Sequence, residues 1–157
     1  MSDTLQLERS PIAFGNAGPQ TRLAADLRAA DLRAAGLRPT RQRIALASIL
    51  FGSGHRHIAA EGLHEEAVAA DVPVSLATIY NTLHQFTDAG LLRQVAVEGA
   101  RTYFDTNVSD HHHFFVEGEN RLIDVESPID IDNIPAPPPG MEVTSVEVIV
   151  RVCRKPA

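Results

Sequence analysis

The apolar residues of this 157-residue chain change their spacing close to Gly90. Before Gly90 they recur every three or four residues, which is the spacing of one face of an α-helix. After Gly90 they alternate with polar residues in runs short enough for β-strands. Helices therefore come first and a small sheet follows, which predicts an α+β fold.

Three helices are predicted in the first half of the chain, over residues 21–35, 41–51 and 59–70. Gly36 stands where the first helix would end with a positive φ, a conformation that glycine adopts without strain. Thr40 is a suitable N-cap for the second helix, because its hydroxyl oxygen accepts a hydrogen bond from a free backbone N–H of the first turn.

A fourth helix is predicted from the N-cap Ser75 to a stop near Gly90. Its apolar side is formed by Leu76, Ile79, Leu83 and Phe86, at steps of three and four residues. Its opposite side is polar, with Thr78, Asn81 and Gln85. Hydroxyl and amide side chains of this kind reach base edges and thymine methyl groups in the major groove. An ordinary amphipathic surface helix has a polar side as well.

A β-hairpin is predicted next, from residues 91–97 and 101–104. Helices followed by a hairpin are the plan of a winged helix-turn-helix, in which the fourth helix would enter the major groove while Arg93 and Arg101 lie along the phosphate backbone. The charge distribution agrees, because residues 22–56 carry seven arginines and two aspartates, whereas residues 107–157 carry four basic and nine acidic groups. This asymmetry favours a nucleic-acid partner for the first half, and a merely solvated arginine-rich face is the alternative.

The rest of the chain predicts a small sheet with little helix. Strands are expected at 114–116, 121–125 and 143–153, and valines alternate in the last of these, so one face should be buried. Five prolines between Ser127 and Gly140 leave room for one or two helical turns at most, near 129–134. Such a sheet has an edge to protect, and pairing with a second copy of the chain is the usual remedy.

We therefore expect a mobile arm at residues 1–18, a winged-helix DNA-binding domain at 19–105 and an α/β dimerisation and sensing domain at 106–157.

Three consecutive histidines, His111 to His113, stand beside Asp105 and Asp110. Neutral imidazole and carboxylate together suit divalent Zn, Fe, Mn and Ni. If the histidines open a strand, His111 and His113 point to one face and His112 to the other. Further ligands must then come from elsewhere in the chain. The alternative is a solvated polar loop that leads into a strand.

Several classes of protein are excluded or disfavoured. The single cysteine, Cys153, permits no intrachain disulfide and no structural zinc held by four cysteines. No run of about 18 apolar residues occurs and the N-terminus lacks a signal-peptide pattern, so a soluble, cytoplasmic protein without a membrane partner is expected. His64-Glu65-Glu66 lacks the second histidine of a zinc-protease motif, and a metal-dependent hydrolase is therefore only a remote alternative.

A series of motifs resembles the ferric uptake regulator family of metal-sensing repressors. The matching pieces are Ala35-Gly36-Leu37, Thr40-x-x-Arg43, His57 with Ala60-Glu61-Leu63, Ser75-Leu76-Ala77-Thr78-Ile79-Tyr80, Leu83-x-x-Phe86-x-x-Ala89-Gly90-Leu91, and Phe104-Asp105 ahead of the histidines. The resemblance implies a homodimer that binds double-stranded DNA at an AT-rich palindromic operator. It also implies a divalent metal, Fe, Mn or Zn, held at the domain junction by His57, Asp105, His111 and His113. The residues that the resemblance and the winged-helix plan assign to DNA are Arg41, Arg43, Ser75, Thr78, Tyr80, Asn81, Arg93 and Arg101.

The chain also departs from the family pattern. Asp105 stands where the family usually has glutamate, Asn81 replaces the usual arginine, and Val116 and Glu119 stand where a Cys-x-x-Cys zinc motif is common. The unbroken histidine run, the missing cysteines and the proline-rich segment resemble the iron response regulator (Irr) branch.

By that resemblance the chain would be an iron- and haem-responsive regulator of iron and haem metabolism genes. Haem would bind at His111, His112 and His113 and lower the affinity for DNA. A metal (Fe or Mn) or peroxide sensor that never meets haem is the alternative within regulation, and a haem carrier without DNA function is a third possibility.

Overall fold

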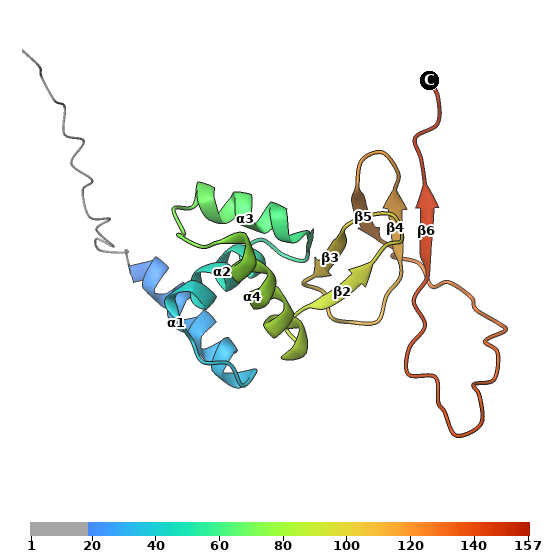
Figure 1. Ribbon diagram of the computed structural model, residues 1–157, viewed down its shortest axis with the longest axis horizontal. Coiled ribbons are helices and arrows are strands. Elements are labelled where there is room, and N and C mark those ends of the chain that lie inside the picture. Colours follow the sequence, from blue (N-terminus) through green and yellow to red (C-terminus); the bar gives the residue numbers. More distant parts are fainter. Residues whose placement is uncertain (1–18) are drawn as a thin grey trace, which may run out of the picture.

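The computed structural model describes residues 19–157, so the predicted arm at 1–18 lies outside the described residues. The described residues form four helices and two three-stranded sheets. The helices lie at one end of the molecule and most of the strands at the other (Figure 1). The helices are α1 Pro19–Ala34, α2 Arg41–Phe51, α3 Ala60–Ala69 and α4 Leu76–Asp88. They lie within two residues of the predicted spans.

The ends of the helices form for the local reasons that the sequence indicates. The Thr40 hydroxyl accepts a hydrogen bond from the Arg43 N–H at 3.2 Å and caps α2. Ser75 caps α4 in the same way, accepting from the Thr78 N–H at 3.1 Å. Gly36 ends α1 with φ +79°, a conformation in which a side chain would be strained.

The strands form two three-stranded sheets, of which the first is antiparallel and the second is mixed. The first has the order β1-β3-β2, and the second has the order β5-β4-β6 with β4 and β6 parallel. Strands β2 and β3 form the predicted hairpin that follows α4. The strands are β1 His57–Ile58, β2 Arg93–Ala96, β3 Thr102–Asp105, β4 His113–Val116, β5 Arg121–Asp124 and β6 Ile149–Val152.

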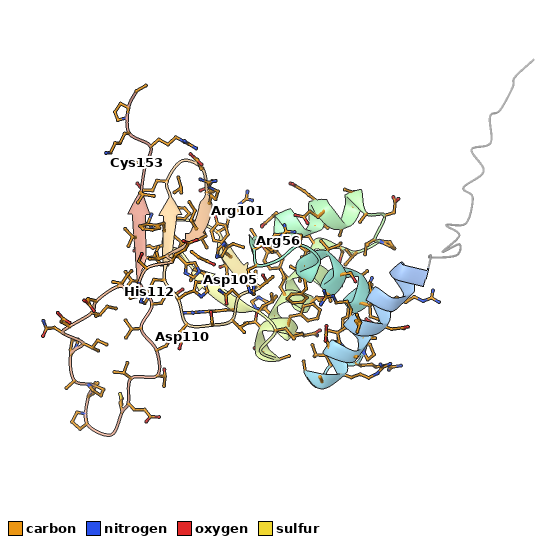
Figure 2. The ribbon with its side chains drawn as sticks, turned by 180° about the vertical axis from the view of Figure 1, so that it is seen from behind. Arg56, Arg101, Asp105, Asp110, His112 and Cys153 are labelled. Atoms are coloured by element: carbon orange, nitrogen blue, oxygen red, sulfur yellow. The ribbon has the colours of Figure 1, made fainter. Side chains whose placement is uncertain are left out.

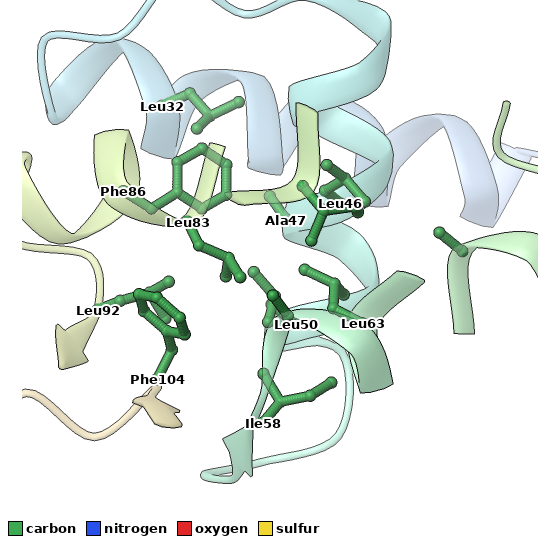
Figure 3. Close-up of a cluster of buried hydrophobic side chains, with 13 residues drawn as sticks. Leu32, Leu46, Ala47, Leu50, Ile58, Leu63, Leu83, Phe86, Leu92 and Phe104 are labelled. Atoms are coloured by element: carbon green, nitrogen blue, oxygen red, sulfur yellow. The ribbon is translucent and has the colours of Figure 1, made fainter. Parts of the chain in front are cut away.

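Two apolar cores hold these elements together. The larger joins all four helices to the first sheet, and Leu83 and Phe86 of α4 are fully buried in it together with Phe104 of β3 (Figure 3). The smaller core joins the two sheets, with Val95 and Tyr103 from the first packed near Phe115 from the second. Each side chain of this size contributes about 1.5–3 kcal/mol when it is buried. The two halves are therefore tied by a much smaller apolar contact than the one inside the helical half.

Two predictions about buried faces are wrong in detail. Leu76, expected on the apolar side of α4, is 37% exposed, and Thr82 is buried instead. Leu76 is the first residue of α4, one turn before the first buried residue of that helix, Ile79.

The last strand is also shorter than the predicted 143–153, since β6 begins only at Ile149 and Val146 is 37% exposed. No helical turn forms between 125 and 148, and the five prolines between 128 and 139 remove backbone donors from much of that loop.

The element order and the two sheets confirm the predicted α+β fold, a winged helix-turn-helix followed by a small α/β unit. Within residues 19–157, none of the helices has the length and apolar character needed to cross a bilayer.

Candidate metal centre

Strand pairing in the first sheet places two ligands of a candidate metal centre, His57 and Asp105, side by side. In the sheet β1-β3-β2, Asp105 of the central strand β3 is paired with His57 on one side and with Arg93 on the other. Directly paired residues point to the same face of a sheet, so these three side chains share one face. Figure 2 shows Asp105 between the helical half and the outer strands.

The second sheet and the segment that leads into it supply the remaining ligands. His113 of β4 is paired with Asp124 at the end of β5. His111, two residues before His113, points to the same side, whereas the intervening His112 lies on the other side, where its Nδ1 accepts the Val148 N–H at 3.1 Å. The predicted separation of His112 from the other two histidines agrees with this geometry.

Three imidazole nitrogens and two carboxylate oxygens converge, all within 4.8 Å of one another. Asp105 Oδ2 lies 3.1 Å from His57 Nε2, 2.8 Å from His111 Nε2 and 3.0 Å from His113 Nε2. Asp124 Oδ1 lies 2.8, 3.1 and 3.5 Å from the same three nitrogens. The structure therefore brings together all four residues predicted as ligands and adds a fifth, Asp124.

Several of these atoms lack hydrogen-bond partners although they are buried. His57 Nε2 and Asp124 Oδ1 lie close together, but their contacts do not have hydrogen-bond geometry, and both atoms are left unsatisfied. Buried polar atoms without partners cost free energy in an ordinary protein interior. His111 Nε2 and His113 Nε2 are in hydrogen-bonding contact with Asp105 Oδ2. The convergence of all five atoms, two of them without a partner, is an arrangement that a metal ion could satisfy.

The pKa values of the centre reflect this crowding. Burial is the largest single influence on His57 and lowers its pKa, but the carboxylates of Asp105 and Asp124 outweigh burial together, so the pKa is raised. Burial is also the largest influence on Asp105 and raises its pKa, yet His113, His57 and the Asn107 N–H outweigh it, so the pKa of this carboxyl falls well below its usual range. Asp105 is therefore an anion at neutral pH although it is fully buried.

The donor set fits a divalent cation of the first transition row. Neutral imidazole with carboxylate suits Mn²⁺, Fe²⁺ and Zn²⁺. Two carboxylates also balance the charge of such an ion, so that a fully loaded centre carries no net charge in a buried place. His57, Asp105, His111, His113 and Asp124 are the residues that would hold it.

Sequence reasoning missed Asp124. A signal was available, because Asp124 follows the alternating strand Arg121-Leu122-Ile123 and a hairpin partner of the histidine strand was expected there. The register needed to align Asp124 with His113 depends on the turn between β4 and β5, where Asn120 adopts a positive φ of 49°.

The polar side chains assigned to DNA on α4 differ in what they contact. Asn81 is exposed, Thr78 is half-buried, and the Ser75 hydroxyl caps the helix. The Tyr80 hydroxyl donates a hydrogen bond to Glu61 Oε1 at 2.8 Å, which raises the tyrosine pKa. Asn81 is therefore the best presented of these four for contact with a base edge.

The arginines assigned to DNA differ in the same way. Arg41 and Arg101 are exposed. Arg43 donates to the Arg38 carbonyl at 2.8 Å and to Gln85 Oε1 at 2.7 Å, so it fastens α2 to α4. Arg93 points to the segment before the histidines, where it donates to the Ser109 carbonyl at 3.0 Å.

His112 faces a separate hollow. A cavity of about 470 Å³ lies on its side of the second sheet. Apolar, acidic, hydroxyl and imidazole side chains line it, including the candidate metal ligand His111: Asp110, His111, His112, Val125, Glu126, Ser127, Pro128, Ile129, Ser145 and Val146.

Fold and site together define a winged-helix protein with a candidate metal centre at the junction of its two sheets. The sequence profile of the ferric uptake regulator family matches residues 34–150, and the chain belongs to that family. Members of the family are transcription regulators rather than enzymes.

Comparison with individual proteins agrees with this assignment. The chain is 36% identical over 90 residues to the peroxide-responsive repressor PerR of Staphylococcus aureus, a match that covers 57% of this chain and 60% of the relative. The fold is similar to the ferric uptake regulator of Pseudomonas aeruginosa with manganese, at a TM-score of 0.62 and 24% identity over 83% of this chain and 99% of that one. It is also similar to the Vibrio cholerae ferric uptake regulator, at a TM-score of 0.64 and 21% identity over 80% of this chain and 98% of that one.

Proposed function

We propose that this chain is a metal-responsive, homodimeric DNA-binding regulator whose affinity for its operator depends on the occupancy of the centre at Asp105. The observation that carries the proposal is the convergence of three imidazole nitrogens and two carboxylate oxygens from both sheets, with buried donor atoms left unsatisfied. His57 and Asp105 come from the sheet attached to the helices, His113 and Asp124 come from the second sheet, and His111 comes from the segment that leads into β4. Occupancy would therefore tie the two halves together.

The second sheet offers the surface for the dimer. Its face turned away from the first sheet carries Phe114 and its cross-strand partner Ile123, together with Val150 of β6 paired with Phe114. Ile123 is exposed, and the two others are only half-buried in a single chain. Burial of this apolar face against a second copy would fix the separation of two α4 helices, as reading a palindrome requires.

We propose that the inorganic signal is a divalent metal, Mn²⁺ or Fe²⁺. We further propose that the Fe²⁺-loaded protein senses peroxide through this metal. The similarity to a peroxide-responsive repressor supports this proposal. Peroxide treatment of the Fe²⁺-loaded protein, with the Mn²⁺-loaded protein as the control, separates a peroxide sensor from a plain metal sensor.

Haem is the second candidate signal, and the hollow beside His112 favours it. His112 is the only histidine of the run outside the centre, and the apolar groups of the hollow suit part of a porphyrin. Because His112 Nδ1 accepts the Val148 N–H, a neutral ring carries its proton on Nε2. Iron ligation at Nε2 would require the proton to move to Nδ1, which could then no longer accept the Val148 N–H. The contact between His112 and the segment just before β6 would therefore be lost. Haem at His111 or His113 would instead compete with the divalent metal.

One experiment tests the proposal and separates the signals. The affinity for an AT-rich palindromic duplex is measured by fluorescence anisotropy with the apo, Mn²⁺-loaded and haem-loaded protein, and a scrambled duplex of the same composition serves as the control. We expect Mn²⁺ to strengthen binding to the palindrome. We also expect the logarithm of the affinity to fall by about 0.9 per neutralised phosphate for each tenfold rise in salt concentration. Equal affinity in all three states would refute regulation through this centre. A Soret band that is lost in His112→Ala but kept in His111→Ala would support haem at the hollow.

A further inference from the structure

Glu147 lies just before β6 and outside the five candidate ligands. Its Oε1 is 3.3 Å from Nδ1 of His113, on the side of that imidazole opposite the metal centre. His113 is fully buried, and its Nδ1 is one of the buried atoms that lack a partner with hydrogen-bond geometry. Among residues 19–157, no other carboxylate is within ion-pairing distance of this nitrogen.

The chemistry of a metal-bound imidazole explains what Glu147 is suited to do. A neutral imidazole that ligates a metal through Nε2 carries its proton on Nδ1. That N–H needs an acceptor when it is buried, and a carboxylate in this position fixes the ring and makes the ligating nitrogen more basic. Glu147 stands where such an acceptor is needed, at a distance that a small rotation of its carboxylate converts into a hydrogen bond.

Glu147 is also linked to the other half of the molecule. Arg93 Nη2 lies 3.7 Å from Glu147 Oε1, and Arg93 Nη1 donates to the Ser109 carbonyl at 3.0 Å. Arg93 belongs to β2, the strand that follows helix α4. The next residue, Val148, binds the histidine segment through its backbone, because its carbonyl accepts the His113 N–H at 3.1 Å.

We propose that Glu147 is a positioning residue of the metal centre: its carboxylate accepts the Nδ1–H of His113, and its ion pair with Arg93 ties the occupied centre to strand β2. This inference rests on the proposed metal site and adds to it the route by which the site acts on the winged-helix half. Arg93 thereby has a role inside the protein rather than on the DNA backbone.

The test uses Glu147→Gln in the full-length chain, because the amide has nearly the same shape but no charge. Zn²⁺ affinity is measured by competition with a chromophoric chelator, and the Nδ1–H proton of His113 is followed by NMR in the Zn²⁺-loaded protein. We expect the affinity to fall by about tenfold or more and the Nδ1–H proton to exchange faster with water. Glu142→Gln, an exposed glutamate five residues earlier in the same loop, is the matched control and should bind as the unaltered protein does.

A double-mutant cycle tests the link to β2. Arg93→Gln, Glu147→Gln and the double variant should show non-additive losses of Zn²⁺ affinity, because the two side chains act through one ion pair. If Glu147→Gln does not fold, Glu147→Asp keeps the charge but withdraws it by one methylene, and its affinity should also fall.

Zn²⁺ affinity within twofold of the unaltered protein in a folded Glu147 variant, with the His113 proton unchanged, would overturn the inference. Failure of the unaltered protein to bind Zn²⁺ or Mn²⁺ at all would instead refute the proposed metal site.

Discussion

Replacing Asp124 by asparagine distinguishes two roles of the cluster, a metal centre and a structural group of ion pairs. The two roles predict opposite effects of the substitution on the stability of the metal-free protein. Asp124 Oδ1 and Asp105 Oδ2 lie within 4.8 Å of each other. At an effective dielectric constant of about 20, two negative charges at that distance repel by about 3.5 kcal/mol. Because the Asp124 side chain is 33% exposed, solvent screening reduces this repulsion to about 1 kcal/mol.

Asp124→Asn should therefore stabilise the apo protein. The substitution removes the repulsion, and the amide N–H₂ offers a donor to His57 Nε2, which is buried without a partner. For a domain of this size, about 1 kcal/mol corresponds to a rise in Tm of about 2–4 °C. Zn²⁺ affinity should fall by about 100-fold or more, beyond the loss typical of residues that only support a ligand.

The assay is thermal unfolding by circular dichroism with and without Zn²⁺, at about pH 8.5 and again at about pH 9.5, because the pKa of His57 is raised above the ordinary histidine value of about 6.5. Asp132→Asn, an exposed aspartate in the loop before β6, is the control for the change of net charge. A lower Tm of apo Asp124→Asn with unchanged Zn²⁺ affinity would refute the reasoning, since it would mean that Asp124 serves folding through ion pairs with the histidines.

Three further predictions follow from named contacts. The pKa of His57 is higher in the folded protein than in the unfolded chain, where it is about 6.5. Protonated His57 therefore stabilises the apo protein fully below about pH 6.5, and this stabilisation is lost as the pH rises through the pKa of His57 in the folded protein. Metal must displace the same proton, so Zn²⁺ affinity should rise over that window while apo stability falls, as titrations and unfolding between about pH 6 and 8.5 will check. Ser75→Ala should lower stability by about 1 kcal/mol, measured by urea unfolding, because the first turn of α4 loses its cap; an unchanged midpoint would contradict this. Asn81→Ala should weaken binding to the palindrome by about tenfold with Zn²⁺ affinity unchanged, and equal loss on a scrambled duplex would argue against base contact.

Local signals in the sequence predicted most of the helical half. Thr40 and Ser75 cap the helices that they were expected to cap, because capping depends on the few residues of one turn. Leu76 shows the limit of this reasoning: periodicity assigns a side chain to a face, but the partner that covers the face is a property of the tertiary structure.

The candidate site was predictable where its ligands are close in sequence and less so where they are not. His111 and His113 share a face because strand residues alternate, and family motifs supplied His57 and Asp105. Asp124 and Glu147 were missed because each depends on the register of a strand paired with β4, and register is set by turns and packing across the sheet. The final strand was overestimated for a related reason, since alternating valines indicate a strand but the loop of prolines decides where pairing begins.

The distribution of contacts between the two halves explains why a metal would matter to DNA binding in this fold. Tyr103 reaches the second sheet through its hydroxyl, which donates to the Asn120 carbonyl at 2.8 Å, and a small apolar core lies beside it. The next large group of contacts between the sheets is the candidate centre, where the ligand atoms of His57, Asp105, His111, His113 and Asp124 lie within 4.8 Å of one another. Asp105 Oδ2 of the first sheet is in hydrogen-bonding contact with His111 and His113 on the side of the second sheet, and an ion held by all five side chains would strengthen this link. Because α4 packs on the first sheet through the larger core, a change in the contact between the two sheets would move α4 together with the first sheet.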